Sequence, residues 1–199
     1  MQGKRILLII SGGIAAYKVC ELIRLFRRAD MPVRCVLTEA GAKFVTPMTL
    51  AALSEQPVCE TLWDLERESK IGHIALSREA DLVVVAPATA DIMARMTHGH
   101  ADDLATTLLL ATDKPVLVAP AMNVRMWQHT ATRRNVAQLR EDGVTVMEPD
   151  EGTMACGEYG PGRLPHVDAI FAAALAFFPL PHAGEGDSLG SERGEGGRN

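Results

Sequence analysis

The sequence predicts a three-layer α/β/α fold, in which a doubly wound, Rossmann-like parallel sheet lies between two layers of helices. Short apolar runs rich in Val, Ile and Leu alternate along the chain with longer stretches whose apolar residues recur at helical spacing. The short runs are apolar at successive positions, as in strands that are buried on both faces. Both observations are typical of a parallel sheet covered by helices on each side.

The predicted strands end at residues that turn or stop the chain. The first is followed by Ser-Gly-Gly, and the third and fourth by proline, which has no backbone N–H to give to a sheet. The strands are expected at residues 5–10, 33–37, 82–86, 116–119 and 144–147. The carboxyl ends of parallel strands lie along one edge of a sheet, so the loops after the first four should gather there. These loops begin at Ser11, Thr38, Pro87 and Pro120.

The predicted helices carry start and stop signals. Pro47 suits a first helical turn, and Gly143 suits a helix end. Two helices in the middle of the chain begin with an aspartate at or near the cap position, and Asp91 is the expected N-cap of the first of them. The helices are expected at residues 15–28, 46–53, 91–98, 102–111, 130–140 and 167–178.

Two segments lack regular patterns. Residues 148–165 read as a long loop punctuated by glycine and proline, and such a loop inside a compact domain is usually functional or disordered. Residues 180–199 are rich in glycine and poor in large aliphatic residues, so they are expected to form a disordered tail. We therefore expect one domain over residues 1–179, of a length that can build a single core.

Composition and charge exclude several classes of function. The net charge is −5 and no basic stripe is present, which argues against a nucleic-acid partner. The four cysteines are scattered, with no CxxC pair or Cys/His cluster at zinc spacing, so no metal site is expected. No apolar run is long enough for a membrane span or a signal peptide. We expect a cytoplasmic protein with free thiols and no membrane partner.

Two loops at the expected ligand edge could bind an anion. In residues 11–16 (SGGIAA), two glycines allow backbone N–H groups to approach a ligand at a helix start, although the spacing fits neither GxGxxG nor a P-loop. In residues 86–91 (APATAD), the Thr89 hydroxyl and nearby N–H groups could hold a phosphate. The first loop is equally compatible with an ordinary tight turn. For the second loop, taken alone, an ordinary capped helix start with Asp91 as the N-cap is the favoured interpretation.

The octet at residues 120–127 (PAMNVRMW) follows the fourth strand. Asn123 offers an uncharged donor and acceptor at the expected ligand edge. Met122, Met126 and Trp127 either surround a ligand with polarizable groups or simply fill the core.

Two further residues have side chains suited to proton transfer. Cys156 places a thiol among small residues of the long loop, whereas an inert cysteine usually lies inside an element. His73 is the second, because the imidazole side chain is suited to proton transfer near neutral pH, although a lone histidine is more often a surface or capping residue.

Taken together, these segments resemble the homo-oligomeric flavin-containing cysteine decarboxylases, in particular the bacterial phosphopantothenoylcysteine decarboxylases. PAMNVRMW matches the family's PxMNxxMW motif, and PATAD matches its Pro-Ala-Ser/Thr-Ala-Asn/Asp motif. HIALSREADLVVVAP matches its histidine segment, and MACGEYGPGR resembles its substrate-recognition clamp. The likeness runs from about Lys4 to Phe178, and four motifs in the right order argue against a chance match.

The resemblance implies FMN as cofactor and assembly as a homotrimer, or a multiple of trimers, with the flavin near a subunit boundary. Carried over by position, the residues expected to line FMN are Gly12, Gly13, Ile14, Thr38, Thr89, Ala90, Asp91, Ile92 and Ala121. The expected substrate-binding residues are Asn123, Thr153 and Ala155. The expected catalytic residues are His73, Asn123 and Cys156.

The implied reaction is the FMN-dependent decarboxylation of N-((R)-4′-phosphopantothenoyl)-L-cysteine to 4′-phosphopantetheine in coenzyme A biosynthesis. Flavin accepts a hydride from the carbon beside sulfur, giving a thioaldehyde, and loss of CO2 leaves an enethiolate that is then reduced. His73 is expected to act as the base and Asn123 to hydrogen-bond the carboxylate or the intermediate. Cys156 is expected to donate a proton during re-reduction, and relatives that act on peptide C-termini need no such step.

Three other functions fit parts of the sequence less well. A flavin prenyltransferase should lack Asn123 and the cysteine clamp. A non-catalytic flavin-binding regulatory subunit would typically have lost one of the catalytic residues, and a generic nucleotide-binding domain should show a phosphate fingerprint. In many bacteria a phosphopantothenate–cysteine ligase domain follows this one, and residues 180–199 contain no such domain. The sequence is compatible with a monofunctional enzyme or with the front part of a bifunctional one, and ligase activity is not expected of this chain.

Overall fold

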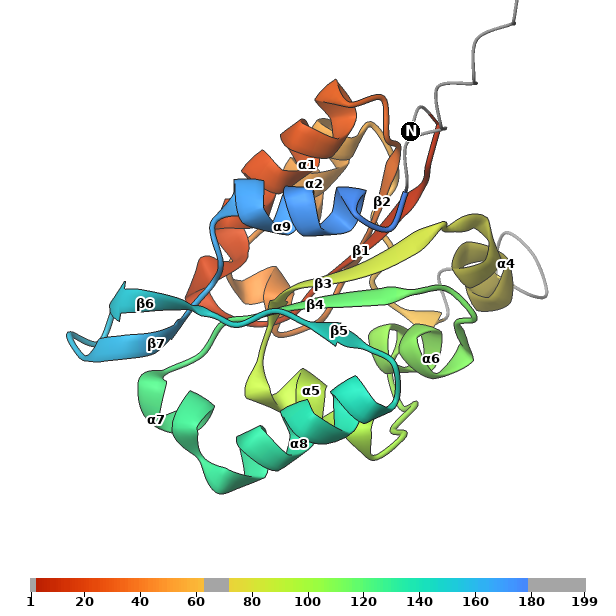
Figure 1. Cartoon of the computed structure of the whole chain (residues 1–199). Coiled ribbons are helices and arrows are strands. Elements are labelled where there is room, and N and C mark those ends of the chain that lie inside the picture. The colour runs from red at the N-terminus through yellow and green to blue at the C-terminus, as the bar shows by residue number, and fades with distance from the viewer. Residues whose placement is uncertain (1–2, 63–71, 179–199) are drawn as a thin grey trace, which may run out of the picture.

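The computed structural model describes residues 3–62 and 72–178 and has a five-stranded parallel sheet at its centre (Figure 1). The strand order is β2-β1-β3-β4-β5, so the order reverses between β1 and β3. The strands are β1 (Ile6–Ile10), β2 (Val33–Leu37), β3 (Leu82–Ala88), β4 (Val116–Pro120) and β5 (Thr145–Val146). This arrangement confirms the predicted fold class.

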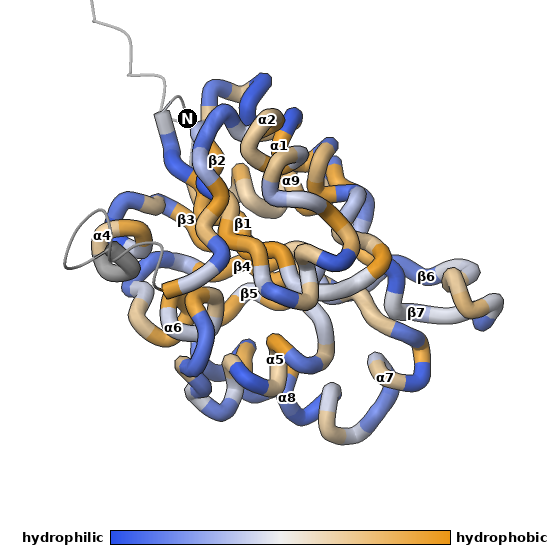
Figure 2. The backbone as a smooth tube through the Cα atoms, turned by 180° about the vertical axis from the view of Figure 1, so that it is seen from behind, coloured by the Kyte–Doolittle hydropathy of each residue, from blue (hydrophilic) through white to orange (hydrophobic). Residues whose placement is uncertain are grey.

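Helices cover both faces of the sheet, because β1 and its neighbours are apolar on both faces. Leu8 and Ile10 of β1 pack into one core cluster and Leu7 and Ile9 into the other, and all four are at most 1% exposed. One face is covered by α1 (Val19–Arg28), α2 (Pro47–Ser54) and α9 (Val167–Leu175). The other is covered by α4 (Gly72–Glu79), α5 (Ala90–Thr97), α6 (Leu104–Ala111) and α8 (Thr130–Glu141). Figure 2 shows the apolar strands enclosed by these helices.

Several element boundaries differ from the sequence predictions. The helix predicted from residue 15 begins as a 3-10 turn, η1 (Ile14–Lys18), and becomes α-helical at Val19. A second 3-10 turn, η2 (Gly41–Lys43), and the short helix α7 (Val124–Gln128) were not predicted. The predicted tail, residues 180–199, lies outside the described residues. Among residues 3–62 and 72–178, none of the helices combines the length and the apolar composition that a membrane span requires.

The prediction that Asp91 caps α5 is wrong. The N-cap is Thr89, whose backbone is extended and whose hydroxyl accepts a hydrogen bond from the Ile92 N–H at 3.2 Å. Asp91 instead lies in the first turn, where a negative charge still suits the positive end of the helix.

Pro87 does not stop its strand, contrary to the prediction. β3 continues to Ala88, which pairs with Pro120 of β4 after an irregularity in register beyond Val85. The missing proline N–H removes one ladder bond, and the local irregularity accommodates this loss. The Pro87 carbonyl still finds donors, because Ser11 of the neighbouring loop supplies two of them.

Residues 148–165 form a β-hairpin instead of an irregular loop. Strands β6 (Asp150–Thr153) and β7 (Tyr159–Arg163) pair in antiparallel fashion and project beyond the sheet (Figure 1). Gly160 and Gly162 allow the close approach, because added Cβ atoms would meet Val124 at 2.7 Å and the Met122 carbonyl oxygen respectively. The Met122 N–H donates to the Gly162 carbonyl at 2.8 Å, which joins the hairpin to the segment after β4.

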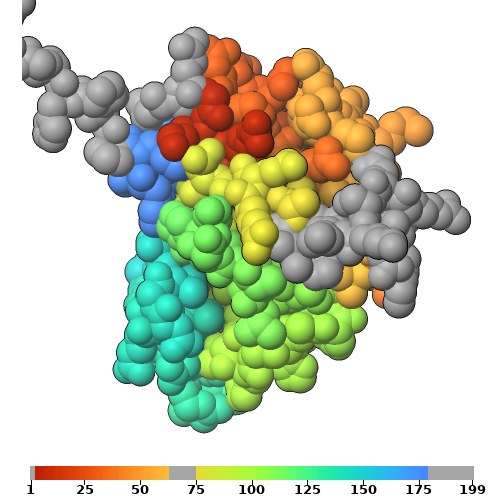
Figure 3. Space-filling model, turned by 90° about the vertical axis from the view of Figure 1, so that its right-hand side faces the viewer, coloured from red at the N-terminus to blue at the C-terminus, as the bar shows by residue number. Residues whose placement is uncertain are grey.

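At the amino end of the sheet, Asp81 joins the starts of β1 and β3. Its carboxylate accepts hydrogen bonds from the Arg5 N–H at 2.8 Å and from the Lys4 ammonium at 2.9 Å. Figure 3 shows the first described residues, in red, beside the yellow segment that holds α4 and the start of β3. Desolvation opposes the ionisation of Asp81, but these hydrogen bonds and charges outweigh it and lower its pKa.

At the carboxyl end, the loops after β1, β2 and β3 contact one another, as predicted. The Ser11 hydroxyl donates to the Pro87 carbonyl at 2.6 Å and accepts from the Thr89 N–H at 3.1 Å. The Thr38 N–H donates to the Ile10 carbonyl at 3.1 Å. Gly12 lies so close to the loop after β2 that an added Cβ would be 2.5 Å from the Ala40 Cβ and 3.0 Å from its carbonyl carbon.

Replacing Gly12 should therefore disturb this packing. We predict that Gly12→Ala lowers the free energy of unfolding by about 1–3 kcal/mol, because the rigid Ala40 backbone must shift. Gly13→Ala is the matched control, since its Cβ would meet nothing closer than 3.9 Å. Urea unfolding of both variants measures the difference, and equal stabilities would contradict the role given to Gly12.

Candidate active site

A cavity of about 920 Å³ lies at the carboxyl end of the sheet, among the loops that follow β1, β2 and β3. Of the residues predicted to line a cofactor, Gly12, Thr38, Thr89, Asp91 and Ile92 line this cavity. Gly13, Ile14 and Ala90 adjoin them in sequence, and the Ala121 N–H donates to the Ala88 carbonyl at 2.9 Å. The predicted cofactor residues are thus gathered at one edge of the sheet.

The cavity wall offers groups that suit an anion. The first N–H groups of α5, those of Ala90 and Asp91, have no acceptor within the helix because they lie in its first turn. Lys43 lines the cavity, and among the described residues it has no ion-pair partner. Arg95 also lines it, but its guanidinium contacts Asp102 and lies 2.8 Å from Asp103. Desolvation would lower the pKa of Arg95, but these carboxylates raise it overall.

The hairpin brings Cys156 to Asn123, across 33 positions of sequence. The Asn123 side chain caps α7, because its Oδ1 accepts the Arg125 N–H at 2.7 Å. This bond fixes the amide orientation, so Nδ2 must point away from the helix. Nδ2 lies 3.4 Å from Cys156 Sγ and also donates to the Glu158 carboxylate. Two of the predicted catalytic residues are therefore in contact.

Glu158 is a member of this cluster to which the sequence prediction assigned no role. Its carboxylate contacts Asn123, lies 3.7 Å from Cys156 Sγ and lies 3.5 Å from Arg125 Nε. The hydrogen bond from Asn123 is the main cause that lowers the pKa of Glu158, and desolvation opposes it. The one available signal was spacing, since Glu158 follows Cys156 by two residues in the predicted clamp.

The remaining predicted residues lie in different surroundings. Thr153 ends β6, and Ala155 lies in the exposed turn next to Cys156. His73 is the second residue of α4, and its side chain lies outside the described part of the chain. Trp127 is 2% exposed and belongs to the core, whereas Met126 is 47% exposed and lines the cavity. The cluster of Asn123, Cys156 and Glu158 is thus linked to the cavity wall through α7.

The cysteines differ in exposure. Cys35 and Cys59 are buried, Cys20 is half-buried, and Cys156 is exposed. Burial raises the pKa of Cys35 to about 12 and also raises that of Cys20. Cys156 is therefore the cysteine accessible to a ligand, and it lies on the predicted clamp.

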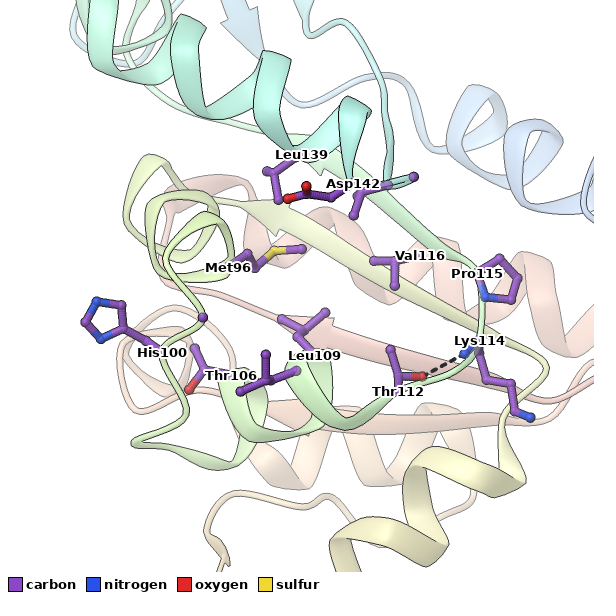
Figure 4. A pocket seen from close by; sticks show the side chains of 14 residues that line it. Met96, His100, Thr106, Leu109, Thr112, Lys114, Pro115, Val116, Leu139 and Asp142 are labelled. Atoms are coloured by element: carbon purple, nitrogen blue, oxygen red, sulfur yellow. Dashed lines mark hydrogen bonds between the residues drawn. The ribbon is translucent and has the colours of Figure 1, made fainter.

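A second cavity, of about 260 Å³, lies at the opposite end of the sheet, where β4 begins (Figure 4). Met96, Leu109 and Leu139 line it from α5, α6 and α8. None of the sequence-predicted site residues lines this second cavity. The larger cavity, in contrast, is lined by five of the residues predicted to bind the cofactor.

The amino-acid sequence matches known proteins over nearly the whole described region. Residues 1–178 match the flavoprotein family. The chain is 47% identical over 178 residues to the coenzyme A biosynthesis bifunctional protein CoaBC of Escherichia coli (strain K12), covering 89% of this chain and 44% of that protein. It is 42% identical to the Bacillus subtilis (strain 168) protein of the same name, with the same coverage. The chain thus spans less than half the length of these relatives.

Solved structures with the same fold carry similar names. A PPC decarboxylase variant complexed with pantothenoylaminoethenethiol superposes with a TM-score of 0.79 at 33% identity, covering 89% of this chain and 99% of that one. The FMN-binding protein AtHal3 superposes with a TM-score of 0.76 at 34% identity, covering 89% and 97%. With the family match over residues 1–178, these likenesses show that the chain belongs to the flavoprotein family.

Proposed function

We propose that this chain is an FMN-dependent decarboxylase that converts 4′-phosphopantothenoylcysteine to 4′-phosphopantetheine in coenzyme A biosynthesis. The observation that carries the proposal is the contact of Asn123 with Cys156, two motif residues that lie 3.4 Å apart near a large cavity. The names of the coenzyme A biosynthesis relatives and of the PPC decarboxylase structure support it. That structure holds pantothenoylaminoethenethiol, by its name an enethiol of the kind the proposed reaction forms.

The cavity suits FMN in size and in chemistry. Its volume of about 920 Å³ falls within the usual range for cofactor sites. The Thr89 hydroxyl, the N–H groups of Ala90 and Asp91 at the start of α5 and the Lys43 ammonium suit a phosphate. We assign cofactor binding to Gly12, Gly13, Ile14, Thr38, Thr89, Ala90, Asp91, Ile92 and Ala121. Bound FMN supplies an electron acceptor for the carbon beside sulfur, which no amino-acid side chain offers.

The protein's own residues bind the substrate and move protons. The Nδ2 of Asn123 is assigned to the substrate carboxylate, because its Oδ1 is already committed to the α7 cap. The Cys156 thiol, at the exposed turn, is assigned as the proton donor that completes the thiol product. Thr153 and Ala155 flank it in the hairpin and are assigned to substrate contact. His73 is assigned as the base that removes a proton from the substrate.

We also propose that the working form is a homotrimer, or a multiple of trimers, in the cytoplasm. Large apolar side chains are exposed on η1, at the end of η2 and on α2, and a second copy of the chain would cover them. These side chains are Ile14, Tyr17, Phe44 and Met48. All four cysteines lie in the described ranges and none forms a disulfide, which suits a reducing compartment.

Mass spectrometry of the product tests the proposed reaction directly. With synthetic 4′-phosphopantothenoylcysteine, we expect the flavin-loaded protein to release CO2 and to form 4′-phosphopantetheine. A peptide that ends in cysteine is the matched control and should remain unchanged. Prenylated flavin formed from a prenyl phosphate would instead identify a flavin prenyltransferase. Flavin binding with no reaction on either substrate would favour a non-catalytic subunit.

The role of Cys156 can be separated from decarboxylation itself. Cys156→Ser should still release CO2 but accumulate an enethiol, because the proton donor for the final step is lost. We expect 4′-phosphopantetheine formation to fall by on the order of 100-fold, the usual contribution of positioned proton transfer. Cys20→Ser, on α1, is the control and should retain full turnover. Normal product formation by Cys156→Ser would refute the assignment.

A further inference from the structure

The side-chain amide of Asn123 has its hydrogen-bonding groups in use before any substrate arrives. Its Oδ1 accepts the Arg125 N–H at 2.7 Å. Its Nδ2 carries two N–H groups and has two acceptors, Cys156 Sγ at 3.4 Å and the Glu158 carboxylate. A substrate that needs this amide must therefore displace one of these partners.

The three partners of Asn123 differ in how readily a substrate could replace them. The Arg125 N–H belongs to the backbone at the start of α7, and losing it would uncap that helix. Cys156 sulfur is a weak acceptor. Glu158 offers a carboxylate, which is the same chemical group as the one the substrate presents. Exchanging one carboxylate for another keeps a charge-assisted hydrogen bond on Nδ2.

We propose that Glu158 is a built-in competitor of the substrate: its carboxylate occupies the place on Asn123 Nδ2 that the substrate carboxylate takes during turnover. This inference rests on the proposed function. The displaced Glu158 keeps nearby partners, since Arg125 Nε lies 3.5 Å and Cys156 Sγ 3.7 Å from its carboxylate. The hairpin itself stays docked through the bond between the Met122 N–H and the Gly162 carbonyl.

The contact between Glu158 and Asn123 makes the site disfavour the substrate, which carries a carboxylate, relative to the decarboxylated product. The hydrogen bond from Asn123 lowers the pKa of Glu158, so the competitor is ionised at neutral pH. While the substrate is bound, two carboxylates lie close together and repel each other. Once CO2 leaves, the ligand has no carboxylate and Glu158 can return to Asn123. Glu158 therefore weakens substrate binding and has no corresponding effect on the decarboxylated product.

The test compares two unreactive ligands that differ only in the carboxylate. These are 4′-phosphopantothenoylserine, with oxygen in place of sulfur, and 4′-phosphopantothenoylethanolamine, which lacks the carboxylate. Calorimetry on the FMN-loaded protein gives both dissociation constants. Glu158→Gln should bind the serine ligand about fivefold more tightly, the effect of one unit charge about 4 Å away in a water-like medium. Its affinity for the ethanolamine ligand should stay within about twofold of wild type.

Glu151→Gln is the matched control, because Glu151 lies exposed on β6 of the same hairpin and has no side-chain partner among the described residues. It should change neither affinity, and thermal unfolding checks that both variants are folded. Unchanged or weaker binding of the serine ligand by Glu158→Gln would overturn the proposal, as would equal changes in the dissociation constants of both ligands. Glu158 would then have only a structural role in the hairpin. If wild-type protein binds neither ligand, the proposed function itself fails.

Discussion

The hydrogen bond from the Ser11 hydroxyl to the Pro87 carbonyl joins the two strands between which the order of the sheet reverses. The chain leaves β1 toward β2 and leaves β3 toward β4, so the connections diverge and leave a crevice at this point. Ser11 holds the two loops together at the base of the crevice, and its acceptance of the Thr89 N–H also fixes the start of α5. The cavity and the N–H groups at the start of α5 depend on this junction.

The hairpin supplies the Cys156 thiol and the Glu158 carboxylate, which the crevice between β1 and β3 lacks. Its glycines bring it against α7, where side chains would collide with Val124 and with the Met122 carbonyl. This packing carries Cys156 and Glu158 to Asn123, whose orientation α7 has already set. One backbone contact, between Met122 and Gly162, thus connects the proton-bearing thiol to the fourth strand of the sheet. The proposed chemistry needs both parts, because the crevice alone would bind a flavin without a proton donor.

The sheet could be predicted from the sequence because its central strands are buried on both faces and therefore apolar at successive positions, as in residues 82–86. The hairpin could not, because glycine and proline have low strand propensity and are used here for close packing. Asp91 and Thr89 are both good capping residues, and the backbone conformation decided between them. Glu158 was missed because its partners come from a distant segment, which no local pattern reveals. The family motifs identified Asn123 and Cys156, and their contact required the fold.

The proposed chemistry requires that the loops after β1, β2 and β3 form a flavin site within this chain. The most direct test is to titrate purified, flavin-free protein with FMN and to follow the absorbance and fluorescence of the flavin. We expect saturation at about one FMN per chain, with release of the flavin on denaturation. Protein that stays colourless and leaves the flavin spectrum unchanged after reconstitution would show that these loops do not form a flavin site.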